Sequence, residues 1–177
     1  MFIIGITGGT ASGKSTIVQN SISNFNENDI GVISQDSYYK QTDNLTHQER
    51  IAINFDHPDA VDFDLLTQQI ISLKNNIPIP QPVYSFHTHN RTKEQIEFVP
   101  KKIVIVEGIL IFNDKRLLDL FDFKIFIDAD ADERLMRRII RDRKDRGRNT
   151  NEIIQRYRTT LKPMHDLYIE PHKKTLT

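Results

Sequence analysis

Cysteine is absent from the 177 residues, which excludes disulfide bonds, metal sites built on thiolates and a thiol nucleophile. A surplus of charge is also lacking, because 24 basic residues balance 24 acidic ones. A chain without net charge has no overall field that would attract nucleic acid or an anionic membrane. The N-terminus lacks the basic segment of a signal peptide, and its apolar run is too short for a membrane span. We therefore expect a cytoplasmic protein, with neither nucleic acid nor a membrane as partner.

The length and composition are those of one ordinary globular domain. The chain is 38% hydrophobic and 27% charged, and a domain of this size buries roughly 70% of the surface that its unfolded form exposes. It contains no internal repeat, low-complexity segment or interdomain linker. We therefore interpret residues 1–177 as a single domain. The cations are unevenly spread, because a basic stretch with helical character runs from Arg134 to Arg148, and we expect something anionic to meet it.

Apolar stretches of strand length alternate with segments of helical character. Residues 103–106 are apolar on every side, which suits a strand buried within a parallel sheet. Similar stretches predict strands at residues 2–7, 30–33 and 124–128. The alternation predicts an α/β fold with a doubly wound parallel sheet, helices on both faces and ligands at the carboxyl ends of the strands.

Capping residues place several helix starts. Asp62 begins a helix in which residues 63, 66, 70 and 73 recur at helical spacing. Three pairs fit the spacing of a helix cap, namely Thr46 with Glu49, Asp130 with Glu133, and Asn149 with Glu152. Pro163 should kink or end the last of these helices. Prolines and two β-rich stretches between residues 79 and 99 predict a hairpin or flap that stands off the main sheet.

Residues 8–15 read GGTASGKS and fit the phosphate-binding pattern G-x-x-x-x-G-K-[ST]. Glycines let backbone N–H groups approach phosphates without a Cβ in the way, and the following helix directs its positive end at them. The predicted strand before this segment and the helix after it disfavour the alternative, a glycine-rich turn that binds nothing. We assign ATP binding to Gly8, Gly9, Thr10, Ala11, Ser12, Gly13, Lys14, Ser15 and Thr16.

The same pattern predicts a magnesium site. Lys14 should reach the β- and γ-phosphates, and the Ser15 hydroxyl should ligate Mg²⁺. Glu107 ends an apolar strand at the place where P-loop proteins keep a second carboxylate directed at the metal. An acid there could instead be a solvated strand end or a helix cap. The expected cofactors are ATP, or GTP, as phosphate donor and Mg²⁺.

Two motifs that the sequence lacks narrow the range of P-loop proteins to which the chain could belong. It has no Asn-Lys-x-Asp motif, which would recognise guanine, and this argues against a GTPase. It also has no Leu-Ser-Gly-Gly motif of the kind found in transport ATPases. Asp36 follows a predicted strand, where it could take up a proton from a hydroxyl or orient that hydroxyl toward the γ-phosphate. Arginines in residues 141–150 could close as a lid and neutralise the transferred group. These features favour transfer to a small acceptor.

Six stretches in order over nearly the whole chain resemble the uridine kinase (uridine-cytidine kinase) family. They are residues 8–15, QDSYY at 35–39, NFDHPDA at 54–60, VYSF at 83–86, VEGIL at 106–110 and RGR at 146–148. The first is generic, whereas the second and third are specific to the family. The resemblance implies a P-loop kinase fold that phosphorylates the 5′-hydroxyl of uridine or cytidine, and a homo-oligomer, typically a tetramer.

The resemblance also implies roles for individual residues. Asp36 resembles the acid that activates the 5′-hydroxyl and faces the magnesium held near Ser15 and Glu107, so the catalytic residues would be Asp36 and Lys14. Arg141 and Arg146 resemble lid residues on the ATP phosphates. The nucleoside pocket would comprise Phe55, Asp56, Tyr84, Phe86, His89, Arg138, Arg148 and Arg156.

Plainer interpretations compete with some of these roles. Phe55 and Phe86 could be core aromatics, and His89 a solvated residue at a hairpin tip. For Arg134, Arg137 and Arg143 we expect the ordinary solvent-facing side of a helix.

The chain also departs from the family pattern. Ser85 stands where the family usually has an acid, and Arg156 where it usually has Gln, which leaves the preference between uridine and cytidine open. Family members continue beyond Pro171 with another strand and helix, so the resemblance implies that the last strand is missing here.

Three other functions stay open at this point. A related P-loop kinase could act on another alcohol, as in the phosphoribulokinase and pantothenate kinase groups, although residues 55–58 argue against it. A regulatory protein could hold nucleotide without turnover. A nucleic-acid-binding module has only the basic stretch in its favour.

Overall fold

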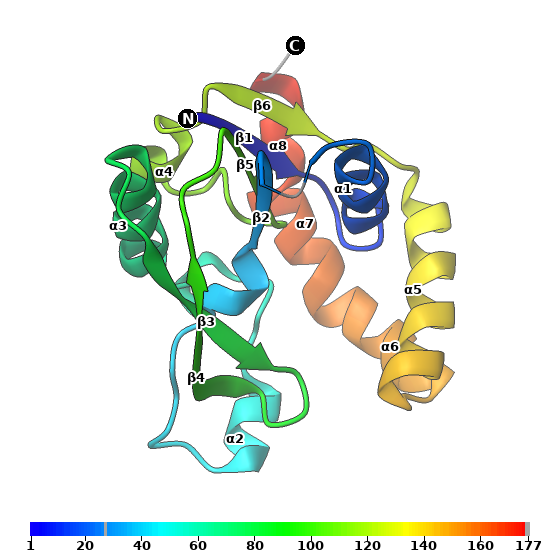
Figure 1. Ribbon diagram of the computed structural model, residues 1–177. Coiled ribbons are helices and arrows are strands. Elements are labelled where there is room, and N and C mark those ends of the chain that lie inside the picture. The colour runs from blue at the N-terminus through cyan, green and yellow to red at the C-terminus, as the bar shows by residue number, and fades with distance from the viewer. Residues whose placement is uncertain (27, 176–177) are drawn as a thin grey trace.

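The computed structural model describes residues 1–26 and 28–175, and the side chains of Asp145, Arg146 and Thr175 lie outside the described part. Within it, four strands form one parallel sheet in the order β2-β5-β1-β6 (Figure 1). Their bounds are β1 (Phe2–Thr7), β2 (Ile30–Ser34), β5 (Ile103–Glu107) and β6 (Phe123–Phe126). All four were predicted, the last of them ending two residues earlier than its sequence suggests.

Alternating side chains of the strands supply two hydrophobic cores, one on each face of the sheet. Val104 and Val106 of β5 belong to the larger core, whereas Ile105 between them belongs to the smaller one. A strand that is apolar on both sides therefore buries both sides, as a parallel sheet covered by helices requires. Full burial of one such aliphatic side chain contributes about 1.5–3 kcal/mol. The predicted doubly wound architecture is confirmed.

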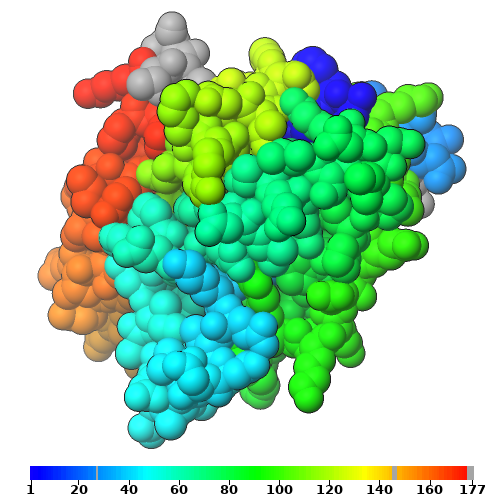
Figure 2. Space-filling view, turned by 90° about the vertical axis from the view of Figure 1, so that its left-hand side faces the viewer, coloured from blue at the N-terminus to red at the C-terminus, as the bar shows by residue number. Residues whose placement is uncertain are grey.

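Helices cover both faces of the sheet (Figure 1). Leu66, Ile70 and Leu73 of α3, all fully buried, pack into the larger core, and Val18 of α1 packs into the smaller one. In Figure 2, α3 faces the viewer near the centre of that side of the molecule. The helix bounds are α1 (Lys14–Ile22), α2 (His47–Ala52), α3 (Phe63–Lys74), α4 (Lys115–Leu118), α5 (Ala131–Arg146), α6 (Thr150–Arg156), α7 (Lys162–Tyr168) and α8 (Glu170–Thr175).

The register of the sheet brings the ends of three strands together. Glu107 at the end of β5 is paired with Ile6 of β1 on one side and with Ser34 of β2 on the other. The loop after β1 and the 3₁₀ turn Gln35–Tyr38 after β2 therefore begin at the same edge of the sheet. This edge is where ligands bind in open α/β folds.

The predicted hairpin is a separate two-stranded antiparallel sheet formed by β3 (Ile79–Ser85) and β4 (Asn90–Phe98). Arg91 anchors it to the body of the protein. Its guanidinium donates to the carbonyl oxygen of Tyr38 at 3.0 Å and to the carboxylate of Asp62 at 3.1 Å. The hairpin is thereby joined both to the turn that carries Asp36 and to the start of α3.

The capping predictions hold at three of four helix starts. Thr46 and Glu49 form a complete capping box before α2, and the Asp62 and Asn149 side chains accept the expected backbone hydrogen bonds. The prediction for Asp130 is wrong, because its side chain makes no capping hydrogen bond although α5 does begin after it. The carboxylate of Asp132 instead accepts the amide N–H of Glu133.

Pro163 neither ends nor breaks the last long helical run. The chain passes from α6 through a π-helical stretch, Tyr157–Leu161, directly into α7. A proline has no N–H to donate and its ring crowds the carbonyl four residues earlier. A wider turn just before Pro163 accommodates both effects, so the predicted end of the helix is wrong, although the regular α-helical geometry is interrupted before the proline.

No helix in the described ranges combines the length and the apolar character that crossing a membrane requires.

Candidate active site

The loop between β1 and α1 has the geometry that its glycines allow. Positive φ angles at Gly8, Ala11 and Gly13 fold it back on itself, and the amide of Ser12 donates to the carbonyl oxygen of Gly9 at 3.1 Å. The first residue of α1 is Lys14, so the positive end of the helix lies at the loop. The structure therefore has the strand, loop and helix that a phosphate cradle needs.

Gly8 is the most constrained residue of this loop. Its φ is +146°, and a Cβ there would collide with the carbonyl oxygen of Ile127. We expect Gly8→Ala to lower the free energy of unfolding by about 2–4 kcal/mol, measured by urea denaturation. Gly147→Ala is the matched control, because Gly147 also has a positive φ, +63°, but no described atom beyond its chain neighbours lies within 4 Å of its Cβ position. The control should cost only about 1–2 kcal/mol, and equal losses would contradict the role of the Ile127 collision.

Lys14 is buried beneath the loop. Its ammonium donates to the carbonyl oxygens of Gly8 at 2.9 Å and Gly9 at 3.1 Å. Burial lowers the pKa of Lys14 from 10.5 to about 8, although the carboxylates of Glu107 and Asp36 act to raise it. A desolvated cation next to open space has a strong electrostatic preference for an anion, and phosphate oxygens would satisfy it.

Two carboxylates face Lys14 from the ends of neighbouring strands. Glu107 accepts a hydrogen bond from the Ser34 hydroxyl at 2.8 Å, and the same hydroxyl accepts from the amide of Asp36 at 3.4 Å. Burial raises the pKa of Glu107, the Ser34 hydrogen bond opposes this effect, and the charge of Asp36 adds to it. The two carboxylates are therefore close enough to repel each other.

These donors fit a magnesium ion that arrives on nucleotide phosphates. Ser15, Asp36 and Glu107 line one cavity, and Ser15 is exposed at the start of α1. Among the described residues no cluster of three or more His, Cys, Asp or Glu side chains could hold a metal by itself. Mg²⁺ is commonly held by one or two protein groups together with phosphates and water, and it would relieve the repulsion between the carboxylates.

Aromatic side chains form the opposite wall of the cavity. Tyr39 contacts Phe55 edge to face, with ring centroids 4.9 Å apart, and Tyr84 at 5.2 Å. The ring of His89 stacks on Phe55 at 5.9 Å, and Phe86 contacts Tyr84 edge to face at 5.3 Å. Phe55 packs against the larger core, as the alternative interpretation expected, yet it also lines the cavity, and Phe86 is half exposed. A planar apolar group would find a fitting surface here.

Tyr39 links this wall to the carboxylates. Its hydroxyl donates a hydrogen bond to Asp36. Burial, followed by the nearby charges of Asp36 and Asp56, holds the pKa of Tyr39 well above its usual range. The hydroxyl therefore stays protonated and orients the Asp36 carboxylate. Tyr39 was not among the predicted site residues, although it belongs to the same QDSYY stretch.

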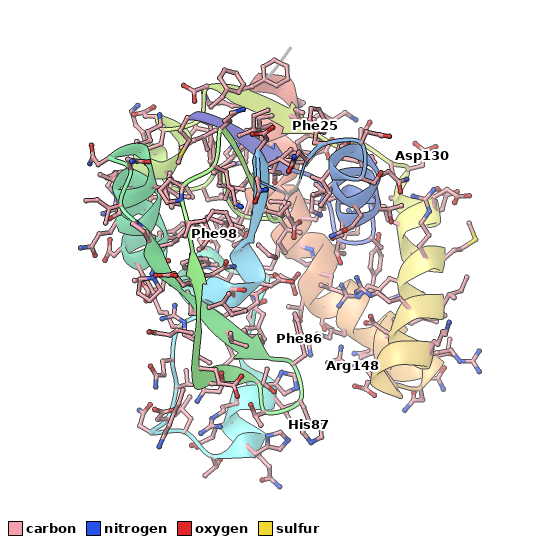
Figure 3. The ribbon with its side chains drawn as sticks, in the orientation of Figure 1. Phe25, Phe86, His87, Phe98, Asp130 and Arg148 are labelled. Carbon is pink, nitrogen blue, oxygen red and sulfur yellow. The ribbon has the colours of Figure 1, made fainter. Side chains whose placement is uncertain are left out.

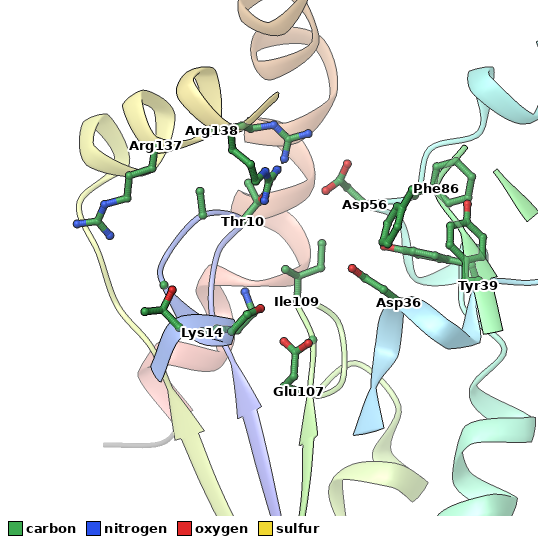
Figure 4. Close-up of a pocket in the computed structure, with 18 of the residues that line it drawn as sticks. Thr10, Lys14, Asp36, Tyr39, Asp56, Phe86, Glu107, Ile109, Arg137 and Arg138 are labelled. Atoms are coloured by element: carbon green, nitrogen blue, oxygen red, sulfur yellow. Dashed lines mark hydrogen bonds between the residues drawn. The ribbon is translucent and has the colours of Figure 1, made fainter. Parts of the chain in front are cut away.

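Asp56 lies between the aromatic wall and the arginines of α5, as Figure 4 shows. The next residue anchors its loop. His57 Nδ1 accepts the amide of Asp59 at 3.1 Å, so Nε2 carries the ring proton and meets the Tyr168 hydroxyl of α7 at 2.8 Å. Asp56 itself is buried and lines the cavity.

Arginines of α5 and of the turn after it close the third side. Arg138 donates to the Thr10 hydroxyl of the phosphate loop at 2.7 Å. Arg141 and Arg148 also line the cavity, and Figure 3 shows Arg148 opposite Phe86 of the hairpin. The side chain of Arg146, another predicted lid residue, lies outside the described part of the chain.

Together these walls enclose a cavity of about 430 Å³ (Figure 4), a size typical of sites for small molecules. Nearly all predicted site residues that the structure describes line it. The exceptions are Gly8, Gly9 and Ser12, which lie within the phosphate loop. The lining also includes residues that sequence reasoning missed or set aside: Tyr39, Gly108, Ile109 and Arg137.

The expectation for the remaining arginines is correct only in part. Arg143 is exposed, and the half-exposed Arg137 pairs with Glu133 at 3.5 Å yet reaches the cavity rim. For Arg134 the expectation of a solvent-facing side chain is wrong. It is buried behind the phosphate loop, where it donates to the carbonyl oxygen of Ala129 at 3.1 Å and contacts His165 at 3.2 Å.

Comparisons with known proteins place the chain among kinases. The sequence model described as the Phosphoribulokinase / Uridine kinase family matches residues 3–176. The chain is 45% identical over 172 residues to a uridine kinase of Staphylococcus carnosus, covering 97% of this chain and 83% of that protein. It is 48% identical over 171 residues to a uridine kinase of Clostridium perfringens (97% and 82%), and 48% identical over 175 residues to one of Chlamydia pneumoniae (98% and 78%).

Solved structures share the fold at low sequence identity. A D-glycerate 3-kinase from Cryptococcus neoformans superimposes with a TM-score of 0.63 at 17% identity, covering 94% of this chain and 78% of that one. A possible uridine kinase from Bacillus stearothermophilus gives a TM-score of 0.57 at 21% identity, covering 88% and 85%. At such identities the likeness establishes the fold alone.

Proposed function

The chain belongs to the phosphoribulokinase / uridine kinase family, and we propose on that premise that it transfers the γ-phosphoryl group of ATP to the 5′-hydroxyl of uridine, cytidine or both. The observation that carries the proposal is the single cavity in which a phosphate loop and an aromatic wall meet across Asp36. A nucleoside lying on that wall and a triphosphate held by the loop would meet at this carboxylate. The relatives at 45–48% identity are named uridine kinases, which favours a nucleoside over another alcohol.

On the donor side, the loop and Lys14 hold the triphosphate. Backbone N–H groups and the start of α1 supply partial positive charge, and Lys14 exchanges its carbonyl partners for phosphate oxygens. Mg²⁺, when bound with the nucleotide near Ser15, Asp36 and Glu107, would neutralise charge on the phosphates. ATP is the donor proposed first, with GTP as the alternative.

On the acceptor side, Asp36 takes up the proton. The nucleoside 5′-oxygen forms a bond to the γ-phosphorus, the bond to the leaving ADP oxygen breaks, and the 5′-hydroxyl proton passes to the Asp36 carboxylate. The Tyr39 hydroxyl donates to that carboxylate, and the Asp36 amide donates to the Ser34 hydroxyl, which fixes the backbone from which the carboxylate projects. Arg141, which lines the same cavity, would neutralise charge on the transferred group.

The nucleoside itself would be held by the far wall. Asp56 and Arg138 would bind the ribose hydroxyls, and Phe55 and Phe86 would pack on the rings. Polar contacts to the base edge would come from Tyr84 and His89, with Arg148 and Arg156 completing the pocket. We further propose that the enzyme works in the cytoplasm as a homo-oligomer, a tetramer by family resemblance, and that residues 141–150 act as its lid.

A panel of acceptors tests the function. With ATP and Mg²⁺, we expect uridine, cytidine or both to yield the monophosphate, detected by anion-exchange chromatography. 5′-Deoxyuridine should yield none, because it lacks the hydroxyl that attacks while keeping the base and both other ribose hydroxyls. If ATP is consumed only with another alcohol such as pantothenate, the proposed nucleoside acceptor is wrong. Tight ATP binding with no product from any acceptor would exclude catalysis.

A further inference from the structure

A carboxylate that sequence reasoning passed over lies at the centre of the arginines. Asp142 belongs to the basic helix α5, yet its side chain is only 1% exposed. Its carboxylate meets the guanidinium of Arg138 at 3.3 Å, that of Arg141 at 2.9 Å and that of Arg148 at 3.7 Å. Each of these three arginines lines the cavity, whereas Asp142 does not.

The backbone brings the three cations to one acid. Arg138 lies one helical turn before Asp142, so the two share a face of α5. Arg148 arrives from beyond the helix, because the amides of Gly147 and Arg148 both donate to the carbonyl oxygen of Asp142. The left-handed Gly147 makes this return possible. Asp142 thus joins the end of α5 to the turn that follows it.

The charge balance around Asp142 shows whether this carboxylate attracts a substrate or orients the arginines. Three guanidiniums this close would repel one another, and a buried carboxylate among them reduces that repulsion and fixes where each points. Glu152 also pairs with Arg148 at 3.7 Å, so two negative charges face three positive ones, which still leaves an excess of positive charge at the cavity. Asp142 therefore need not attract either substrate, and its contribution is the geometry of the arginines.

The arrangement also reaches the phosphate loop. Arg138 contacts Asp142 through Nε and donates through Nη1 to the Thr10 hydroxyl. A chain of contacts therefore runs from the loop that would hold the triphosphate, through Arg138 and Asp142, to Arg141 and Arg148.

We propose that Asp142 is a positioning residue for phosphoryl transfer, which holds Arg138, Arg141 and Arg148 in the orientation that the transition state requires. The proposal rests on the kinase function proposed above. A displacement of about 1 Å in a positioned group can cost about 10²-fold in rate. Substitution of Asp142 would leave the three arginines in place and remove only the carboxylate that orients them. The proposal therefore predicts a loss of turnover without a matching loss of ATP binding.

The Asp142→Asn variant tests this separation. We expect kcat at saturating nucleoside to fall about 10- to 100-fold, while the Kd for ATP·Mg²⁺, measured by titration calorimetry, stays within about threefold of the wild-type value. The Kd is preserved because removal of one negative charge strengthens the attraction of the site for phosphates as it loosens the arginines. Asp132→Asn, which removes an exposed carboxylate from the same helix, should leave both quantities unchanged.

A second comparison asks whether Asp142 acts through an arginine. If it does, the fall in kcat for Asp142→Asn combined with Arg141→Met should be clearly smaller than the product of the two single losses. An unchanged kcat in Asp142→Asn, losses that multiply in full, or a Kd for ATP that rises as much as kcat falls would each overturn the proposal. The last result would mean that Asp142 only keeps the lid folded.

The conservative variant covers the case in which Asp142→Asn does not fold, as judged by circular dichroism. Asp142→Glu keeps the charge and should stay folded, with kcat reduced by about two- to tenfold. A folded Asp142→Glu protein that loses 100-fold or more, or nothing at all, would contradict the proposal. Wild-type turnover is measured first. A wild-type protein that phosphorylates no nucleoside would contradict the proposed function as well. A wild type and an Asp142 variant that both turn over at the same rate would contradict this inference alone.

Discussion

Asp36→Asn is expected to lower kcat by about 10²- to 10⁴-fold, because the amide cannot take up the proton of the attacking hydroxyl. The surroundings of Asp36 support this effect. Its backbone amide donates to the Ser34 hydroxyl and its carboxylate accepts from Tyr39, so the side chain is held before any substrate enters. Asparagine has nearly the same shape, and the substituted protein should therefore keep its fold.

Initial rates with uridine and cytidine, together with the Kd of ATP measured in the absence of Mg²⁺, check this expectation. Without the metal, the affinity for ATP should not depend on Asp36. If the Kd of ATP·Mg²⁺ is unchanged as well, metal binding is intact and the loss in kcat belongs to the acceptor step. Asp59→Asn is the matched control, since this carboxylate is 90% exposed and does not line the cavity. A kcat for Asp36→Asn within threefold of the wild type would remove Asp36 from the role of base.

The fold followed from the sequence because its signals are local and repeated. Residues 103–106 are apolar on every side, which only a strand covered on both faces can satisfy. Glycines and a lysine at fixed spacing after β1 left little freedom for the loop. The errors came where local rules compete with neighbours. Asp130 has the right residue type for a cap but makes no capping bond. The helix does not end at Pro163, because a π-helical turn that the sequence pattern does not predict accommodates the proline.

The candidate site was less predictable where it depends on distance in space. Asp36, Asp56 and the arginines could be named because each lies in a recognisable stretch. Asp142 and Arg134 could not be named in this way, since a charged residue on a basic helix is expected to face solvent unless the elements that pack against it are known. Arg134 is buried between the phosphate loop and His165 of α7, and Asp142 is buried among guanidiniums that include Arg148, which the Gly147 turn returns to it. Periodicity identifies a helix but does not say which charged face will be covered.

Lys14→Met is expected to reduce kcat/KM for ATP by about 10²- to 10³-fold or more, through loss of a desolvated positive charge at the phosphates. The same substitution should alter stability in a way that depends on pH. In the unfolded chain Lys14 would keep its proton up to pH 10.5, whereas in the fold burial lowers its pKa to about 8. Between these values the unfolded state binds more protons, so the free energy of unfolding of the wild type rises with pH in this window.

The variant lacks this titration, which makes the difference between the two proteins the quantity to measure. Urea denaturation of both at pH 7 and pH 10.5 should show the wild type gaining about 3 kcal/mol relative to Lys14→Met. Lys162→Met is the control, because that lysine is exposed and paired with Asp166, and it should give no such gain. Equal pH dependence in the wild type and Lys14→Met would mean that Lys14 is not desolvated. In that case a desolvated Lys14 would not provide the electrostatic attraction for phosphate. The replacement of its two carbonyl partners by the oxygens of a triphosphate would then need another explanation.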